Sequence, residues 1–359
     1  MKICINGRFL SQEITGVQRY SMELVKALDA LLNKEKNIQV EILCPPNIIH
    51  SPELQNIQIR KIGILKGHLW EQLELPLYSR NSLLFNPCGP APLLKFKQIL
   101  TIHDAAIYAN SQAFTKKFII WYKIMFFLIS KTAKKIITVS EFSKNELINY
   151  LKVKNSHIKV MHLGKEHITE IKEDTSIIEK YELDKKPFIL AVSSMSPNKN
   201  FNGVVKSIEH LDKNNEINIV IAGGVHPKVF GGANNFRSDQ VKHVGYITDN
   251  ELKTLYKNAL CFVYPSYYEG FGLPPLEAMS LRCPVIVSDR ASLPEVGGAN
   301  VLYCNPDDPA DIAQKISLMI KNSNINQEYK DKGYKRSKDF SWYKCAQGLL
   351  ETCKEVSKG

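Results

Sequence analysis

The sequence predicts an α/β protein made of two doubly wound, Rossmann-like domains. Short apolar, β-rich runs alternate with helical runs along almost the whole chain, which is typical of βαβ units and parallel sheets. The alternation is interrupted at 152–187, where the chain is charged and weakly patterned, and we expect a linker there. A length of 359 residues suits two domains of ordinary size.

The first series of elements opens with a strand at the start of the chain. Apolar and β-branched runs predict strands, and helical patterns predict helices between them. The expected strands are 2–6, 38–43, 57–62, 83–86, 98–102 and 136–139, and the helices are 17–32 and 141–151. We assign them to an N-terminal domain over 1–165.

The second series repeats this alternation over 186–340. The expected strands are 188–193, 217–222, 241–244, 260–264 and 284–287, and the helices are 202–211, 274–281, 309–321 and one that begins near Thr248. The pattern around Trp342 predicts a last helix, which either packs on the second domain or crosses back to the first. Ligands of such sheets lie at the carboxyl ends of the strands, so the loops there carry the candidate sites.

Composition excludes several classes of protein. A hydrophobic fraction of 44% and a charged fraction of 23% are typical of a soluble globular chain. The eight cysteines include no C-x-x-C pair, so we expect neither a metal site nor disulfides, and a reducing, cytoplasmic location. The net charge of +11 comes mostly from dispersed lysines without a recognisable binding motif, so nucleic acid is not an expected partner.

A basic and apolar segment lies between Asp104 and Glu141, and no acidic residue falls between them. The run 118–129 is apolar almost all round a helix and is too short to span a bilayer. It suits either a buried core helix or an interfacial helix that brings 114–135 to an anionic membrane, because lysines beside aromatic side chains are attracted to anionic headgroups. The flanking lysines are Lys116, Lys117, Lys123, Lys131, Lys134 and Lys135.

The most informative segment is the turn between Glu269 and Glu277. A buried strand is expected before it and a helix beginning near Pro274 after it, so unpaired backbone N–H groups would point into a glycine-containing loop that suits an anion. The carboxylates themselves repel phosphate and match the neutral hydroxyls of a sugar or ribose. The alternative is a plain strand-to-helix turn with two surface acids.

The N-terminal half offers two further candidate loops. Thr15 and Gly16 stand where a helix begins, so Thr15 is a candidate cap and Gly16 would admit a phosphate close to the backbone. His103 and Asp104 follow the strand 98–102. A histidine there either contacts a substrate oxygen or serves only the fold.

The C-terminal half offers weaker candidates beside its glutamates. Lys199 lies next to a helix start, where an ammonium group strengthens an anion site, although a solvated lysine is the alternative. Ser194 and Asn198 add donors that serve either a phosphate or only the turn. Tyr246 follows a strand that ends in glycine, a position that either brings the backbone near a planar base or serves only the geometry of the turn.

Together these segments resemble the signature of glycosyltransferase family 4. The resemblance is strongest over 264–279, which contains both glutamates, and continues through 284–288 and 293–296. It covers nearly the whole chain, because it also extends to Thr15-Gly16, His103-Asp104, 139–143, 197–200 and 340–342. The chain is most similar to the branch that contains bacterial O-antigen mannosyl- and rhamnosyltransferases.

The resemblance implies a GT-B fold, in which two Rossmann-like domains face each other across a cleft and the last helix, 341–359, crosses back onto the first domain. It also implies metal-independent transfer with retention of configuration. His103 and Glu269 would contact the donor sugar at the reaction centre, and Glu277 would hold the ribose hydroxyls. The remaining donor contacts would be Gly16 and Lys199 at the diphosphate and the backbone of Gly270, Phe271, Gly272 and Leu273.

One departure concerns the diphosphate. Members of this family commonly place an arginine beside the lysine of the diphosphate loop, and 193–198 contain none. The remaining phosphate charge would then be met by Lys199 alone, by helix dipoles, or by Arg290 or Arg19.

The residues and the resemblance together predict a retaining glycosyltransferase with the nucleotide sugar as co-substrate and no other cofactor. It would move a hexosyl unit, of the mannose or rhamnose type, from a nucleotide-diphosphate sugar to a lipid-linked oligosaccharide of a surface polysaccharide, either O-antigen or capsule. We expect it in the cytoplasm, as a peripheral protein of the membrane if 114–135 bind there. A nucleotide-sugar epimerase of the same fold and a non-catalytic carbohydrate- or membrane-binding protein are the alternatives.

Overall fold

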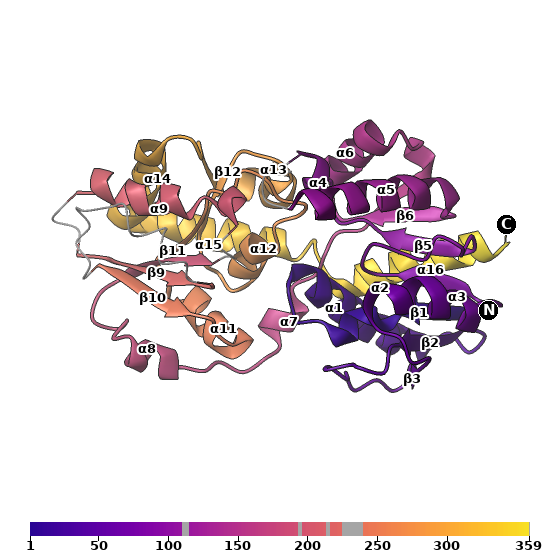
Figure 1. Cartoon of the computed structure of the whole chain (residues 1–359). Coiled ribbons are helices and arrows are strands. Elements are labelled where there is room, and N and C mark those ends of the chain that lie inside the picture. The colour runs from indigo at the N-terminus through magenta and orange to yellow at the C-terminus, as the bar shows by residue number, and fades with distance from the viewer. Residues whose placement is uncertain (110–114, 193–195, 213–215, 225–239, 359) are drawn as a thin grey trace. The chain divides into compact units, whose positions relative to one another are not determined.

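In the computed structural model the chain forms two compact units, one made of 1–164 with 341–359 and the other of 165–340 (Figure 1). The structure describes every residue except 110–114, 193–195, 213–215, 225–239 and 359. Ser194, a predicted donor, lies outside the described residues.

The described part of the first unit holds a seven-stranded parallel sheet of order β3-β2-β1-β4-β5-β6-β7. Its central strands are buried on both faces, which is typical of parallel sheets covered by helices. The strands are β1 (Lys2–Asn6), β2 (Gln39–Cys44), β3 (Gln58–Lys61), β4 (Leu83–Asn86), β5 (Gln98–Thr101), β6 (Lys135–Thr138) and β7 (Ile158–Val160).

The helices of this unit include the last one of the chain, α16 (Trp342–Lys358), which packs along α1 (Gly16–Leu32). Lys354 of α16 pairs with Glu35 at 2.7 Å, and Cys345 and Leu349 are buried. The others are η1 (Gly7–Ser11), α2 (Gly67–Leu69), the π-helical turn η2 (Trp70–Glu74), α3 (Leu75–Tyr78), α4 (Ala106–Ala109), α5 (Lys116–Thr132), α6 (Glu141–Leu151) and η4 (Asn155–His157).

The described part of the second unit holds a six-stranded parallel sheet of order β10-β9-β8-β11-β12-β13. The strands are β8 (Phe188–Val192), β9 (Asn218–Ala222), β10 (Val241–Gly245), β11 (Cys261–Tyr264), β12 (Val285–Ser288) and β13 (Leu302–Cys304). The helices are α7 (Glu166–Thr169), α8 (Ser176–Lys180), η5 (Pro197–Lys199), α9 (Phe201–Ser207), η6 (Ile208–His210), α11 (Asp249–Asn258), α12 (Leu273–Ser280), α13 (Leu293–Gly297), η7 (Gly298–Asn300), α14 (Pro309–Lys321) and α15 (Ser323–Ser337).

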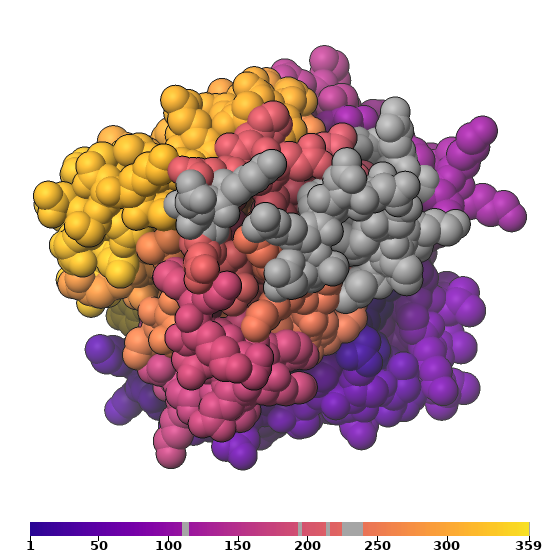
Figure 2. Space-filling model, turned by 90° about the vertical axis from the view of Figure 1, so that its left-hand side faces the viewer, coloured from indigo at the N-terminus to yellow at the C-terminus, as the bar shows by residue number. Residues whose placement is uncertain are grey.

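The two Rossmann-like parallel sheets that the alternation predicts are confirmed. The stretch 152–187 differs from the expected linker, because it contains β7, α7 and α8. Figure 2 shows the pink segment around α8 lying against orange residues of the second unit. The contacts join it to β10, because Lys242 donates to the backbone oxygen of Tyr181 and the Tyr181 hydroxyl donates to the backbone oxygen of Val244. The pattern there is weak because each element is short and carries few apolar residues.

Helix α5 packs into the core with one face, at Met125, Phe126 and Ile129. Its opposite face exposes apolar side chains, with Ile120 at 60% and Ile124 at 52%. The helix is therefore a core helix on one face, and whether the other face contacts a membrane stays a prediction. No helix among the described residues combines the length and the apolar character needed to cross a bilayer.

Gly7 generates a prediction about stability. A Cβ atom there would lie 2.5 Å from Ile42 Cγ2 and 2.7 Å from the backbone oxygen of Leu43, so the Gly7→Ala variant must displace β2. We expect a loss of about 1–3 kcal/mol in the free energy of unfolding, measured by urea denaturation. Gly16→Ala is the matched control because a Cβ atom there meets nothing within 4 Å, and equal losses in both variants would contradict this packing.

Candidate functional site

The loops that follow β8 and β11 in the second unit are tied together by Asn198. Its backbone oxygen accepts hydrogen bonds from Tyr267 N at 2.7 Å and from Ser266 Oγ at 2.8 Å. Its side-chain amide donates to the backbone oxygen of Tyr268 at 3.0 Å. Asn198 therefore holds the lysine loop and the glutamate loop at the same edge of the sheet.

Lys199 and Glu269, both predicted site residues, form an ion pair across these loops. Lys199 Nζ lies 2.7 and 2.8 Å from the two carboxylate oxygens of Glu269, which is buried. Ser266 Oγ lies 2.6 Å from Glu269 Oε1 and shares its one proton between this oxygen and the Asn198 carbonyl. Lys199 also donates to the Tyr264 hydroxyl at 3.2 Å. Burial and then the Glu269 charge raise the pKa of Tyr264 well above its usual value, so it remains a neutral phenol.

Glu277 is held by two residues that sequence reasoning did not single out. His167 Nε2 lies 2.7 Å from Glu277 Oε1, and the Tyr256 hydroxyl donates to Oε2 at 3.1 Å. All three side chains are buried. Burial and the Glu277 charge raise the pKa of Tyr256 well above its usual value, so its hydroxyl stays a donor. The carboxylate is thus fixed in orientation by the protein.

The backbone between the glutamates is fixed as well. The Ser292 hydroxyl shares its one proton between the backbone oxygens of Glu269 and Phe271, which lie 2.9 and 2.8 Å from Oγ. Gly272 has a φ of +106°, and a Cβ atom there would lie 2.8 Å from Leu293 Cδ2, so only glycine fits before α12 begins at Leu273. The predicted strand, glycine turn and helix N-terminus therefore lie in sequence, with Gly270 between the two fixed carbonyls.

Two other predicted residues of this unit lie in different surroundings. Arg290 pairs with Asp289 and with Asp307, each at 3.2 Å, so carboxylates already neutralise its guanidinium. Tyr246 is 91% exposed. Both ion pairs of Arg290 are exposed, so Arg290 stays a predicted candidate for the arginine that the diphosphate loop lacks.

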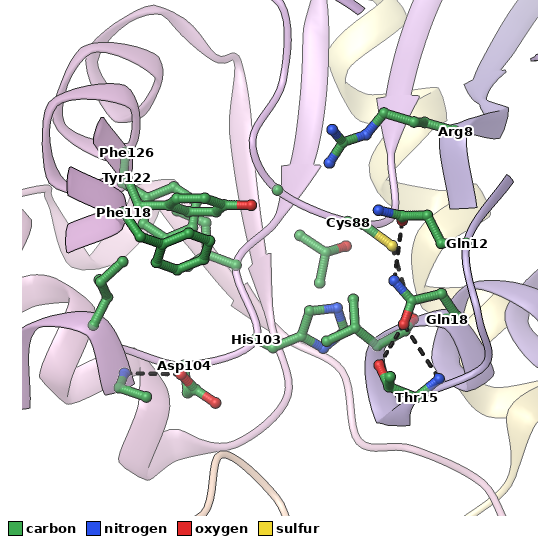
Figure 3. Close-up of a pocket in the computed structure, with 16 residues that line it drawn as sticks. Arg8, Gln12, Thr15, Gln18, Cys88, His103, Asp104, Phe118, Tyr122 and Phe126 are labelled. Carbon is green, nitrogen blue, oxygen red and sulfur yellow. Dashed lines mark hydrogen bonds between the residues drawn. The ribbon is translucent and has the colours of Figure 1, made fainter. Parts of the chain in front are cut away.

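The first unit contains a pocket of about 280 Å³ that brings together Thr15, His103 and Asp104 (Figure 3). Figure 3 shows aromatic rings of α5 on one side and the polar groups of Gln12, Gln18 and Thr15 on the other. The lining residues that sequence reasoning missed include Arg8, Gln12, Gln18, Cys88, Phe118, Tyr122 and Phe126. Aromatic faces opposite amide groups suit a sugar ring, because such pockets combine apolar contact with a few placed hydrogen-bonding groups.

The start of α1 forms one wall of this pocket. Thr15 donates both its backbone N–H, at 3.3 Å, and its hydroxyl to Gln18 Oε1, which fixes the first helical turn. Gly16 is exposed beside it, with open space where a side chain would stand. Arg19 lies half-buried one turn further along α1. The backbone at Gly16 is thus accessible to a ligand.

His103 lies half-buried in the pocket with its ring edge-on to Tyr20, at 4.6 Å between centroids. Burial lowers its pKa to about 4, so the imidazole is neutral at pH 7. Nε2 lies 3.1 Å from the backbone oxygen of Pro87, which can only accept, so Nε2 carries the proton and Nδ1 is an acceptor. Asp104 Oδ1 accepts a hydrogen bond from Ala106 N at 2.8 Å, at the residue where α4 begins.

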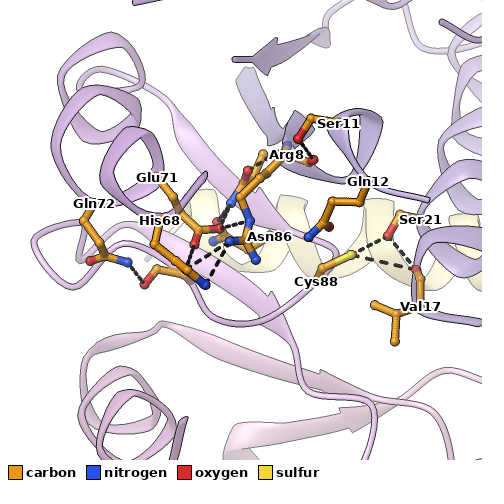
Figure 4. Close-up of polar contacts among 12 residues, drawn as sticks. Arg8, Ser11, Gln12, Val17, Ser21, His68, Glu71, Gln72, Asn86 and Cys88 are labelled. Carbon is orange, nitrogen blue, oxygen red and sulfur yellow. Dashed lines mark hydrogen bonds and ion pairs between the residues drawn. The ribbon is translucent and has the colours of Figure 1, made fainter. Parts of the chain in front are cut away.

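Arg8 reaches the same pocket from a buried polar network, shown in Figure 4. Its Nε lies 3.3 Å from Glu71 Oε1 and its Nη1 lies 3.0 Å from His68 Nδ1. Glu71 is fully buried in η2 and also accepts from Asn6 Nδ2 at 2.8 Å. The network compensates the charge of Arg8 and fixes the guanidinium at the pocket wall.

Comparison with known proteins gives one family and one fold. Residues 173–336 match the family model described as glycosyl transferases group 1, which confirms the predicted resemblance over this part of the chain. The O-antigen chain mannosyltransferase B of Escherichia coli is 27% identical over 392 residues, covering 99% of this chain and 100% of that protein.

Solved structures share the fold at low identity. Sucrose-phosphate synthase from Thermosynechococcus elongatus matches with a TM-score of 0.77 at 18% identity, over 99% of each chain. Anabaena HepE in complex with UDP and glucose matches with a TM-score of 0.76 at 14% identity, over 99% of this chain and 100% of that one. The predicted GT-B fold class is confirmed.

The surroundings of His103 predict a pH dependence. Its pKa is about 4 in the folded chain against 6.5 ordinarily, so the unfolded chain takes up the proton first as pH falls. The contribution of neutral His103 to the free energy of unfolding should be fully present above about pH 6.5 and should be lost as the pH falls toward 4. Thermal unfolding measured over this range should show a smaller decline in His103→Gln than in the wild type, and equal declines would contradict the assigned neutral imidazole.

Proposed function

Residues 173–336 belong to the glycosyl transferases group 1 family, and from this premise we propose that the protein is a retaining hexosyltransferase that uses a nucleotide-diphosphate sugar. The observation that carries the proposal is the pair of oriented carboxylates, Glu269 and Glu277, around one glycine turn with Lys199 beside them. The match to the HepE complex with UDP and glucose supports a donor of this class.

Glu277 is assigned to the ribose of the donor. Its two oxygens already accept hydrogen bonds from His167 and Tyr256, and a carboxylate has further lone pairs with which to accept from hydroxyl groups. Because both protein donors hold it in place, binding ribose requires little reorganisation. We therefore assign Glu277 the role of positioning the ribose, because the carboxylate is buried and both of its neighbours hold it in one orientation.

Lys199 is assigned to the diphosphate and Glu269 to the donor sugar. In the absence of a ligand each neutralises the other. A diphosphate would draw the ammonium group toward its oxygens, and Glu269 would then accept hydrogen bonds from sugar hydroxyls. The backbone of 270–273 at the start of α12 would supply further donors, which offsets the missing arginine.

Transfer breaks the bond between the anomeric carbon and the diphosphate oxygen and forms a bond to an acceptor hydroxyl. The acceptor proton leaves with the phosphate, and fixed donors stabilise the developing negative charge. In the first unit, Gly16 is assigned to the diphosphate and His103 Nδ1 to a hydroxyl of the donor sugar. Retention and independence from a metal belong to this proposal.

The acceptor is proposed to be a lipid-linked oligosaccharide of a surface polysaccharide, and the transferred sugar a mannose-type hexose. The similarity to an O-antigen chain mannosyltransferase supports both. The exposed apolar face of α5 supports a peripheral place on the cytoplasmic face of the membrane, because apolar side chains flanked by lysines favour an anionic interface.

The donor assignment is tested with a panel of nucleotide sugars, reading nucleoside diphosphate release with and without a lipid-linked acceptor. Lys199→Ala and Glu277→Ala should each lower turnover by about 10²–10³-fold, because each removes a fixed group at the donor. Lys206→Ala, which removes an exposed lysine of α9, is the matched control. Unchanged turnover in the first two variants would sink the assignment.

The membrane contact is tested by co-sedimentation with vesicles of phosphatidylcholine and phosphatidylglycerol. Replacing Ile120 and Ile124 of α5 with serine should weaken binding by about tenfold or more, because two exposed apolar side chains no longer enter the interface. The control replaces two other exposed isoleucines of the first unit, Ile14 and Ile49, with serine. If both double variants bind as the wild type does, α5 is not the contact.

A further inference from the structure

A second pocket of the first unit, about 340 Å³ in volume, is lined mostly by basic side chains. It lies where the end of α5 and the start of β6 meet the segment that follows α6. The lining residues are Ser130, Lys131, Lys134, Lys135, Lys152, Val153, Lys154, Ser156 and His157. None of them is acidic.

The positive charge of this pocket is not compensated within the described part of the chain. Lys131 Nζ contacts the backbone oxygens of Leu151 and Lys152, each at 3.2 Å, and Lys135 Nζ contacts that of Ser156 at 2.8 Å. Among the described residues, no carboxylate pairs with any of the five lysines. Five like charges around one cavity repel one another and produce a strong positive potential, which an anion would relieve.

His157 supplies an independent observation. Its Nε2 atom is buried and has no hydrogen-bond partner. Burial and the charges of Lys135 and Lys131 lower its pKa, against the opposing effect of the Ala133 carbonyl. Such a buried, unpartnered group is uncommon in proteins and suits a ligand that restores its hydrogen bond.

The pocket adjoins the exposed apolar face of α5. Lys131 Nζ lies 5.5 Å from the centre of the Phe127 ring, and Phe127 and its neighbour Leu128 are exposed. Cationic groups therefore border an apolar surface, as an amphiphile with an anionic head and apolar chains requires. A free phosphate ester would use only the pocket.

We propose that this pocket binds the phosphate of an anionic phospholipid headgroup while the exposed face of α5 contacts the acyl region. The inference rests on the membrane contact proposed above and adds a specific headgroup site to it. Lys131 and Lys135 are held by backbone oxygens and form the wall, and Lys134, Lys152 and Lys154 are the flexible cations. Because the Ala133 carbonyl occupies the proton on the other ring nitrogen, His157 donates to a phosphate oxygen from Nε2 as the imidazolium.

The headgroup site is tested with a variant that keeps the fold. Lys152 has a φ of +52°, so Lys152→Gly removes a charge and also relieves a left-handed backbone. Combined with Lys154→Ser it should weaken binding to phosphatidylglycerol vesicles by about 100-fold or more, because the loss of the pocket adds to the about fivefold that each lysine near the surface contributes. The control, Lys116→Ser with Lys117→Ser, removes the same charge from the other end of α5 and should weaken binding by about 25-fold at most, the contribution of two lysines near the surface alone.

Equal losses in these two variants would overturn the headgroup site and leave the membrane contact standing. If the wild-type protein does not co-sediment with the vesicles, the membrane contact of α5 is itself overturned. A second readout is the titration of His157 by NMR with glycerophosphoglycerol, a soluble phosphodiester headgroup. Binding should raise the pKa of His157, because an anion favours the imidazolium. If the pKa of His157 does not change, the headgroup site is contradicted. If it rises but the two double variants lose vesicle binding equally, the pocket binds a soluble phosphate ester and the lipid proposal is contradicted.

Discussion

The ion pair between Lys199 and Glu269 is the interaction on which the second unit's site depends. It joins two loops that follow different strands, and Asn198 and Ser266 reinforce it with hydrogen bonds to backbone and carboxylate. A buried pair of this kind contributes little net stability, because desolvation offsets the Coulomb attraction. The pair instead fixes the positions of both charged groups, so that an ammonium for phosphate and a carboxylate for hydroxyls are in place before a ligand binds.

One helix of the first unit, α5, borders three different surfaces. Phe118, Tyr122 and Phe126 follow at intervals of four residues, so they share one face and line the pocket that contains His103. Ile120, Ile124 and Phe127 lie on the exposed side of the same helix. Its lysines continue into the basic pocket at its C-terminal end.

The sequence predicted the site where its residues are consecutive. The strand, glycine turn and helix around Glu269 and Glu277 could be inferred because local patterning specifies each part, and the bounds of α6 and α14 were found for the same reason. The partners of those residues could not be inferred. His167 comes from a weakly patterned stretch 110 residues from Glu277, and Tyr256 looks like any apolar position of a helix.

The same limit explains the other differences. The pairing of Arg290 with Asp307 could not be inferred, and Arg8 gave no signal because its partners Glu71 and His68 are distant in sequence. Helix α15 buries only Asn326, Gly333 and Ser337, so it has no apolar stripe to detect. Residues that act through contacts distant in sequence can be found only from the folded structure, whereas residues of one continuous loop can be predicted from the sequence.

The most direct measurement is a crystal structure of the protein with a nucleoside diphosphate bound. The account predicts ribose hydroxyls within hydrogen-bond distance of Glu277, which remains held by His167 and Tyr256, and a diphosphate oxygen bound by Lys199 Nζ with its contact to Glu269 lengthened. A nucleotide bound elsewhere, or a Lys199–Glu269 pair unchanged beside an occupied site, would contradict it.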